Sequence, residues 1–203
     1  IRDSTFTNPI FPLGGSEFVL SARFSLPYSL WNGVDYANLG DLEKFQDDDG
    51  NPDPAKIEQE KFKWLEFYKI KFKGSWYTRL FDKLVLRTHT EFGFLGAFNN
   101  DRGVIPLDRF FLGGDGMSQY AMDGRETISL RGYPNQSLSS QDGSTIYNRF
   151  SLELRYPITL KPAASIFGLT FMETGQGFNN FREFNPFNGK RSVGLGLRIF
   201  MPA

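Results

Sequence analysis

Apolar and polar residues alternate with a period of two along six segments of the chain, and helical periodicity is scarce. Between positions 17 and 26 the even positions are apolar and most odd positions are polar, as with Leu20 and Phe24 against Arg23. Such alternation is typical of antiparallel strands with one apolar and one polar face. The predicted strands span residues 17–26, 67–76, 84–94, 146–156, 163–174 and 192–201.

The segment 163–174 departs from this pattern. Phe167, Leu169 and Phe171 have the same parity as Glu173. Either a β-bulge shifts the alternation, or this strand places bulky apolar residues on the polar side of the sheet. The sequence leaves both alternatives open.

The length of the predicted strands favours a membrane barrel over a soluble β-sandwich with one wet face. The strands are about ten residues long, and a tilted strand needs about 9–11 residues to cross a bilayer, whereas strands in soluble proteins average about 5–6 residues. Phe and Leu dominate the apolar face, and aromatic residues gather at strand ends, as in the girdles of outer-membrane barrels. These aromatic residues are Trp64, Trp76, Tyr77, Tyr147 and Tyr156.

The connections between the strands alternate between short and long, which fits tight periplasmic turns and extended outer loops. The short connections are 79–83 and 157–162. The long ones are about 28–63, 97–145 and 175–190. The pattern therefore predicts an all-β fold, a partial antiparallel transmembrane β-barrel of about six to seven strands in one domain over residues 1–203.

Six strands are too few to close a transmembrane barrel, whose smallest bacterial form has about eight. An open sheet in lipid would leave the backbone groups of its edges unpaired. The chain begins at Ile1 without an initiator Met and ends at Ala203 directly after a strand. We therefore expect further strands outside this chain.

The composition excludes several classes of function. The chain has 23 basic and 23 acidic residues, so it lacks the basic excess of a nucleic-acid binder. With no Cys and a single His, it offers no disulfide framework, thiol nucleophile or Cys-ligated zinc site, and we expect neither a cofactor nor a metal. No stretch approaches the length of an apolar membrane-spanning helix.

Three sets of motifs carry a resemblance to a known family. The motif stretches are 110–114 (FFLGG) with 129–133 (SLRGY), 8–15 (NPIFPLGG), and 171–175 (FMETG) with 191–197 (RSVGLGL). They resemble, respectively, the loop motif, a turn before a mid-barrel strand, and later strands of the BamA family of outer-membrane β-barrel assembly proteins, and they occur in the family's order. The acidic insertion 41–60 is similar to that of BamA proteins from the Bacteroidetes group.

The resemblance implies a barrel of about sixteen strands, of which this chain is the later half without the final two. POTRA domains and earlier strands would lie upstream. The family is integral to the outer membrane of Gram-negative cells, and it templates insertion of client β-barrels at a seam between the first and last strands. Its partners are these clients, assembly-complex lipoproteins and the bilayer, and it is not an enzyme.

The resemblance also implies a site in which the long loop folds into the lumen. The planar fork of Arg131 would bind carboxylates of the inner wall, a task for which Arg is suited because it stays charged when partly buried. Glu173 stands where the family usually has Asp. Two alternatives stay open: Arg131 is an exposed loop residue that contacts neither carboxylate, or the ion pair forms and only braces the barrel rather than gating insertion. The implied site residues are Gly113, Gly114, Arg131, Gly132, Tyr133, Glu153 and Glu173.

Other functions and sites have less support. A two-partner secretion transporter shares the barrel and the loop motif. A lipid-modifying enzyme would use His89, but nothing in the sequence marks a Ser near it. The acidic run 47–58 has carboxylates at calcium-like spacing, but Gly50 and Pro52 are misplaced for an EF-hand, so a solvated loop is expected. The stripe Lys69, Lys71 and Lys73 would attract anionic segments, face water or pair with neighbouring acids.

Overall fold

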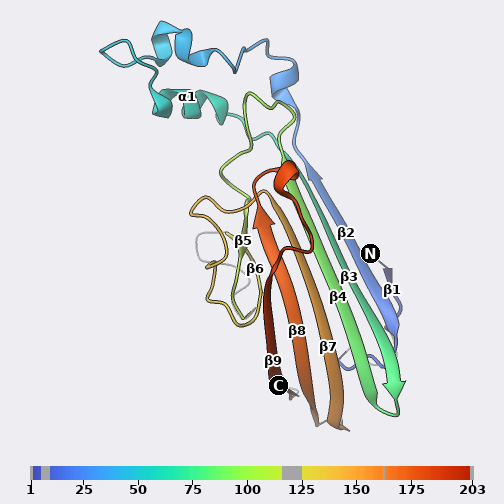
Figure 1. Ribbon diagram of the computed structural model, residues 1–203. Helices are drawn as coiled ribbons and strands as arrows, with labels where there is room; N and C mark the ends of the chain where they lie inside the picture. Colours follow the sequence, from blue (N-terminus) through green and yellow to red (C-terminus); the bar gives the residue numbers. More distant parts are fainter. Residues whose placement is uncertain (1, 6–9, 116–124, 162, 202–203) are drawn as a thin grey trace.

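A seven-stranded antiparallel sheet forms most of the molecule, in the order β1-β2-β3-β4-β7-β8-β9 (Figure 1). The structure, a computed structural model, describes residues 2–5, 10–115, 125–161 and 163–201. Within these residues β1 pairs only with β2, and β9 only with β8, so the sheet is not closed. The strands are β1 (Arg2–Asp3), β2 (Gly15–Phe24), β3 (Tyr68–Phe81), β4 (Leu84–Gly96), β7 (Ile146–Lys161), β8 (Ala164–Phe178) and β9 (Lys190–Phe200).

The predicted all-β partial barrel is confirmed. Each predicted segment coincides with one long strand, and β1 adds a short seventh. No helix in the described part of the chain is long and apolar enough to span a membrane. Residues 8 and 9 of the turn motif, and residue 162 of the predicted short connection, lie outside the described residues.

Three predicted boundaries are wrong because the strands run further than expected. β3 continues to Phe81, so most of the predicted 79–83 connection lies in a strand. Pro157 stays within β7, opposite Phe167, and the register shifts between Pro157 and Thr159. Proline is compatible with a strand at such an irregularity, where no ladder hydrogen bond is required of it. At the other end β8 continues to Phe178, because Gly177 lets the side chain of Ser144 pack against the backbone where a Cβ would clash.

The two faces of the sheet differ in chemistry. One face exposes large apolar side chains, including Leu20, Leu152, Met172 and Leu195. The opposite face carries the 97–145 connection, whose strands β5 (Phe110–Leu112) and β6 (Glu126–Ile128) pair in parallel beside the sheet (Figure 1). We call these the apolar face and the polar face.

The polar face is layered. Near the outer loops, a cluster of buried apolar residues joins the 97–145 connection to the strands, with Phe110 and Tyr147 at a ring distance of 4.6 Å. At the opposite end a second cluster packs Phe11 against Phe167, with ring centroids 5.1 Å apart. Charged side chains fill the space between these clusters. The clusters contain Leu95, Phe110, Leu112, Ile128 and Tyr147, and Phe11, Val85, Phe167 and Leu169, respectively.

The register of β8 decides between a β-bulge and apolar residues on the polar face, the two alternatives for the fifth predicted strand. The pairing of β7 with β8 is regular from Ile146 opposite Phe178 down to Pro157 opposite Phe167. No bulge therefore separates Phe167 from Glu173, and the strand does place bulky apolar residues on the polar face. They are buried there because Phe11, from the segment before β2, folds beneath them.

The aromatic residues at strand ends do not all face outward. Trp64, Trp76 and Tyr156 are exposed, as expected of a girdle. Tyr147 is fully buried under β5, and Tyr77 packs against the second apolar cluster, which contains Phe11 and Phe167. Their odd parity places them on the polar face, so the prediction of a girdle role for these two is wrong.

The 28–63 connection forms a small lobe with its own apolar cluster of Tyr36, Leu39 and Phe45. Its helix α1 (Pro54–Lys61) begins at Asp53, whose carboxylate accepts hydrogen bonds from the backbone of Ala55 and Lys56. Such capping satisfies amide groups that the first helical turn leaves free. The carboxylate of Asp47 likewise accepts backbone hydrogen bonds within its own turn. These two carboxylates therefore shape the lobe. The lobe's short 3₁₀ helices are Tyr28–Leu30, Leu39–Asp41 and Glu43–Phe45.

Candidate functional site: a loop arginine on the polar face

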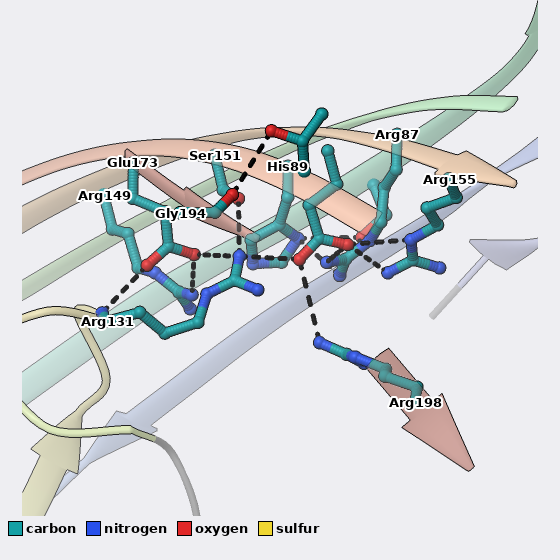
Figure 2. Close-up of polar contacts among 12 residues, drawn as sticks. Arg87, His89, Arg131, Arg149, Ser151, Arg155, Glu173, Gly194 and Arg198 are labelled. Atoms are coloured by element: carbon teal, nitrogen blue, oxygen red, sulfur yellow. Dashed lines mark hydrogen bonds and ion pairs between the residues drawn. The ribbon is translucent and has the colours of Figure 1, made fainter. Parts of the chain in front are cut away.

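Arg131 reaches from the 97–145 connection to two carboxylates of the sheet (Figure 2). Its Nη2 donates to Glu173 Oε1 on β8 and to Glu153 Oε1 on β7, each at 2.6 Å. Its backbone N–H donates to the other oxygen of Glu173 at 2.9 Å. The guanidinium also lies 3.7 Å from the centre of the Phe171 ring. One arginine therefore joins the loop to two neighbouring strands.

The electrostatics of this contact are those of a largely desolvated ion pair. The Arg131 side chain is 17% exposed, and the side chains of Glu153 and Glu173 are almost fully buried. Burial by itself lowers the pKa of Arg131, but the hydrogen bond and charge of Glu173, with those of Glu153, outweigh it and raise the pKa above its usual value. Arg131 therefore stays charged, as an ion pair with two buried carboxylates requires.

The neighbouring residues of the motif fix the loop around Arg131. Tyr133 donates its hydroxyl to the backbone carbonyl of Arg191 on β9 at 2.7 Å. Gly132 approaches Ser192 of the same strand. Gly113 and Gly114 have positive φ angles of 115° and 114°, and a Cβ on either would clash with the backbone or side chain of the Pro134–Asn135 turn. The structure thus brings all the sequence-implied site residues together on one side of the sheet.

A wider charged network surrounds the pair, and the sequence did not single out its members. Arg149 donates to Glu173 at 2.8 Å and to Glu91 at 3.2 Å, so it links β4, β7 and β8. Glu153 is also bonded by Arg155 and lies 3.6 and 3.7 Å from two further guanidinium groups. These last two belong to Arg87 and Arg198.

The strand register explains why these residues meet. Arg87 is directly opposite Glu153, and Glu91 is directly opposite Arg149, so opposite charges face each other across the β4–β7 pair. Cross-strand partners on one face have their Cβ atoms within about 5.5 Å. Odd parity was visible in the sequence, but the register that pairs particular residues was not.

His89 has a serine neighbour that the sequence did not reveal. Ser75 lies directly opposite it on β3, with its Oγ 2.8 Å from His89 Nδ1. The other ring nitrogen is 2.7 Å from Glu91 Oε1. Arg87 also donates to the Ser75 hydroxyl, at 3.2 Å. Nothing in the sequence marked this Ser, because it comes from another strand and meets His89 only through the strand register.

A second anchor holds the connection nearer the outer loops. Lys69 of β3 is buried, and its ammonium group donates to the backbone carbonyl of Asp108 at 2.6 Å and lies 2.8 Å from Glu126. Lys71 bonds the same Glu126 at 2.7 Å, and Lys73 lies 3.7 Å from Glu91. The lysine stripe therefore pairs with acids, which was one of the alternatives open in the sequence.

This outer anchor is expected to weaken at low pH. Burial alone raises the pKa of Glu126, but the bonds from Lys69 and Lys71 outweigh it and lower the pKa below its ordinary value. A depressed pKa gives stability that is present above the unfolded value, about 4.3, and is lost as the pH falls through the folded value. A spin label at Thr127 should therefore stay immobile from neutral pH to about pH 4 and become mobile below it.

The variant Glu126→Gln tests the origin of that release. It should loosen the label already at neutral pH and flatten the change at low pH. A low-pH release of the same size in the variant would assign the transition to other carboxylates.

The geometry defines a class of protein. An open antiparallel sheet with an exposed apolar face, and with a loop bonded by charge to its polar face, is a portion of a membrane β-barrel with an inward-folded loop. Beside Arg131 a polar basin of about 410 Å³ is lined by charged residues of β3, β4 and β7. No group of three or more His, Cys, Asp or Glu suited to a metal ion occurs among the residues that the structure describes.

Comparison with known proteins identifies the family. The Omp85 superfamily domain matches residues 7–203, so the chain belongs to the Omp85 superfamily. Its members are membrane-embedded β-barrels with roles in protein insertion or transport. Over 124 residues the chain is 29% identical to a SAM50-like protein of Schizosaccharomyces pombe, a match that covers 54% of this chain and 24% of that protein. The chain therefore spans about a quarter of the length of this relative.

Proposed function

We propose that this chain is part of the barrel of a BamA-type insertion factor, which templates the folding and insertion of client β-barrel proteins. The observation that carries the proposal is the pair of hydrogen bonds that Arg131 donates to Glu153 and Glu173. It ties a loop of the 97–145 connection to the wall at the level of β7 and β8. The mechanism forms and breaks no covalent bond, because a template acts by presenting backbone hydrogen-bonding groups and a complementary surface to the client.

The remaining parts of the proposal concern the whole protein. We propose that further strands complete a barrel of about sixteen, that POTRA domains precede it, and that the barrel is integral to the outer membrane of a Gram-negative cell. Its partners would be unfolded client barrels and assembly-complex lipoproteins. Membership of the Omp85 superfamily supports insertion or transport in general.

The docked loop supports a positional role. Its contacts reach β3 through Lys69, β7 and β8 through Arg131, and β9 through Tyr133. Because the loop is bound to β3 at one side and to β9 at the other, it holds these two strands, which are not neighbours in the sheet, in a fixed relative position. Such a brace would hold the end of the sheet at β9 in the position from which a templating strand continues.

The test is reconstitution of the full-length protein in lipid vesicles with an unfolded outer-membrane barrel as client. We expect the protein to accelerate client folding, seen as a shift to the compact, heat-modifiable band on gels. Translocation of an unfolded exoprotein into the vesicles without any acceleration of barrel folding would favour the secretion transporter instead.

The serine–histidine–glutamate contact supports a second candidate, a lipid-modifying enzyme. The order Ser75–His89–Glu91 is that of a nucleophile, a base and an orienting carboxylate. Against this role, Glu91 also binds Arg149, and Ser75 is held by Arg87, as expected of a structural network.

We therefore expect His89→Ala to leave client folding within about twofold of the parent, because the loop contacts of Arg131 do not involve His89. The same variant and Ser75→Ala should be compared for hydrolysis of phospholipid in mixed micelles. A hydrolytic activity of the parent that both variants lose would establish the enzyme.

A further inference from the structure

The loop between β8 and β9 folds back over the apolar face rather than away from the sheet. The ring of Phe181 stacks on Phe94 of β4, with centroids 5.5 Å apart and an interplanar angle of 1°. Phe184 packs edge-on against Phe94 and Phe178. The side-chain amide of Asn148 donates to the carbonyl of Pro186 at 3.0 Å. In Figure 1 this loop descends in front of the sheet, whereas β5 and β6 lie beside it.

A hollow of about 460 Å³ opens on this face, below the loop. Its size falls within the range of small-molecule sites, about 300–1,000 Å³. The shape follows from the strand register. Thr88 on β4 lies opposite Leu152 of β7, and Thr174 on β8 lies opposite Phe150 of β7, so short side chains flank large ones on this face. The wall includes Thr88, Phe150, Leu152, Met172, Thr174 and Arg191.

Arg191 is the cation at the edge of this apolar hollow. It lies directly opposite Thr174, and the next residue on the same face of β9 is the exposed Val193, opposite Met172. The Arg191 side chain is exposed and makes no ion pair within residues 2–5, 10–115, 125–161 and 163–201. Its neighbour Lys190 is also exposed, but as the adjacent residue of the strand it lies on the opposite face of the sheet.

We propose that this hollow binds one phosphate-bearing lipid of the bilayer, with the phosphate on Arg191 and an acyl chain against Phe150, Leu152 and Met172. The face is the one that a membrane barrel turns toward lipid, and it continues without a break along Val193, Leu195 and Leu197. A guanidinium at this position needs an anionic partner, because an uncompensated charge beside hydrocarbon is costly. Its planar fork matches a phosphate in two parallel hydrogen bonds.

The loop above the hollow has the chemistry of the membrane interface. Phe181 is 60% exposed and Phe187 is 83% exposed, although both belong to a loop that packs on the apolar face. Aromatic rings are favoured where hydrocarbon meets headgroups. The exposed Arg182 lies between them in the sequence. The level of the loop therefore corresponds to the headgroup region, and the hollow beneath it to the acyl chains.

The lipid site adjoins the docked loop of the other face. The backbone carbonyl of Arg191 accepts the hydrogen bond of Tyr133, while its side chain borders the hollow. A lipid bound at Arg191 would therefore stabilise the start of β9, to which the Arg-Gly-Tyr loop is attached. The inference stands independently of client insertion, since it concerns lipid binding alone.

The experiment is native mass spectrometry of the full-length protein in detergent, titrated with phosphatidylglycerol. Arg191→Ala should weaken the first bound lipid at least fivefold. Lys190→Ala is the matched control, with the same charge one residue away on the other face, and should change the affinity less than twofold. Met172→Trp, which fills the hollow and keeps Arg191, should also weaken binding, and this separates the acyl contact from the charge.

Four further measurements make the proposal falsifiable. Diacylglycerol, which lacks the phosphate, and inorganic phosphate, which lacks the chains, should each bind more weakly than phosphatidylglycerol. Equal lipid affinity in the Arg191 and Lys190 variants would overturn the site, as would phosphate binding as tightly as the lipid. A photo-crosslinker at position 193, which keeps Arg191 and lies next to it on the same face, would also overturn it by capturing a protein segment instead of lipid in vesicles. Heat-modifiability of each variant shows that the barrel is folded.

Discussion

Arg131→Ala in the full-length protein is expected to release the Arg-Gly-Tyr loop and to slow client folding by at least tenfold. The change removes two side-chain bonds to buried carboxylates, each 2.6 Å long. Hydrogen bonds to charged groups contribute about 1.5–3 kcal/mol each. Glu173 keeps Arg149 and Glu153 keeps Arg155, so we expect the loss to be partial, about 2–3 kcal/mol in total. That corresponds to a shift of about 30- to 140-fold in the docking equilibrium.

Hydrogen exchange at residues 129–133 measures the release directly, and client folding in vesicles measures its consequence. Arg182→Ala is a suitable control, because Arg182 is an exposed loop arginine without an ion pair in the described part of the chain. Arg131→Lys should recover only part of the docking, because an ammonium group can donate to both carboxylates, as Nη2 does, but loses the stacking of the planar guanidinium on Phe171. Rapid exchange of the loop with normal client folding would mean that the contact only braces the barrel.

Glu153→Ala is expected to destabilise the barrel more than any other single change on the polar face, by about 3–5 kcal/mol. Its buried carboxylate is bonded by Arg131 and Arg155 and lies within 3.7 Å of the guanidinium groups of Arg87 and Arg198. Removing it leaves Arg87, Arg155 and Arg198 without the carboxylate that each contacts, whereas Arg131 keeps Glu173. Such uncompensated buried charge costs more than the pair contributes.

The measurement is the free energy of unfolding of the full-length protein in urea, in lipid vesicles. Glu17→Ala is the control, because Glu17 borders the same basin without an ion pair among the described residues. A second substitution, Arg155→Met in the Glu153→Ala background, should restore part of the stability by removing one of the stranded charges. A loss below about 1 kcal/mol in the single variant would show that water compensates the arginines.

The alternation of the sequence was enough for the fold class and for the main strands. A side chain's face depends only on its parity, and parity is a local property of the chain. The boundaries were less certain where proline or glycine lies inside a strand. Pro157 and Gly177 are turn-forming residues in the sequence, but a register shift and the packing of Ser144 retain them in β7 and β8.

The site was accessible from the sequence only in part. The resemblance singled out Arg131, Glu153 and Glu173, and the structure brings their side chains within hydrogen-bonding distance; their role in insertion stays a prediction. The contributions of Arg149, and of Ser75 to His89, were not accessible, because both depend on which residue of the neighbouring strand lies opposite.

The strands, their two faces and the charged character of one of them follow from a period of two along the chain, so they could be predicted from the sequence alone. The fold was needed to show which charges meet, why Phe167 is buried on the polar face, and that the loop after β8 folds over the apolar face. These features depend on register and loop packing, which join residues far apart in the chain. Their energy depends on distances across the sheet, which no local pattern encodes.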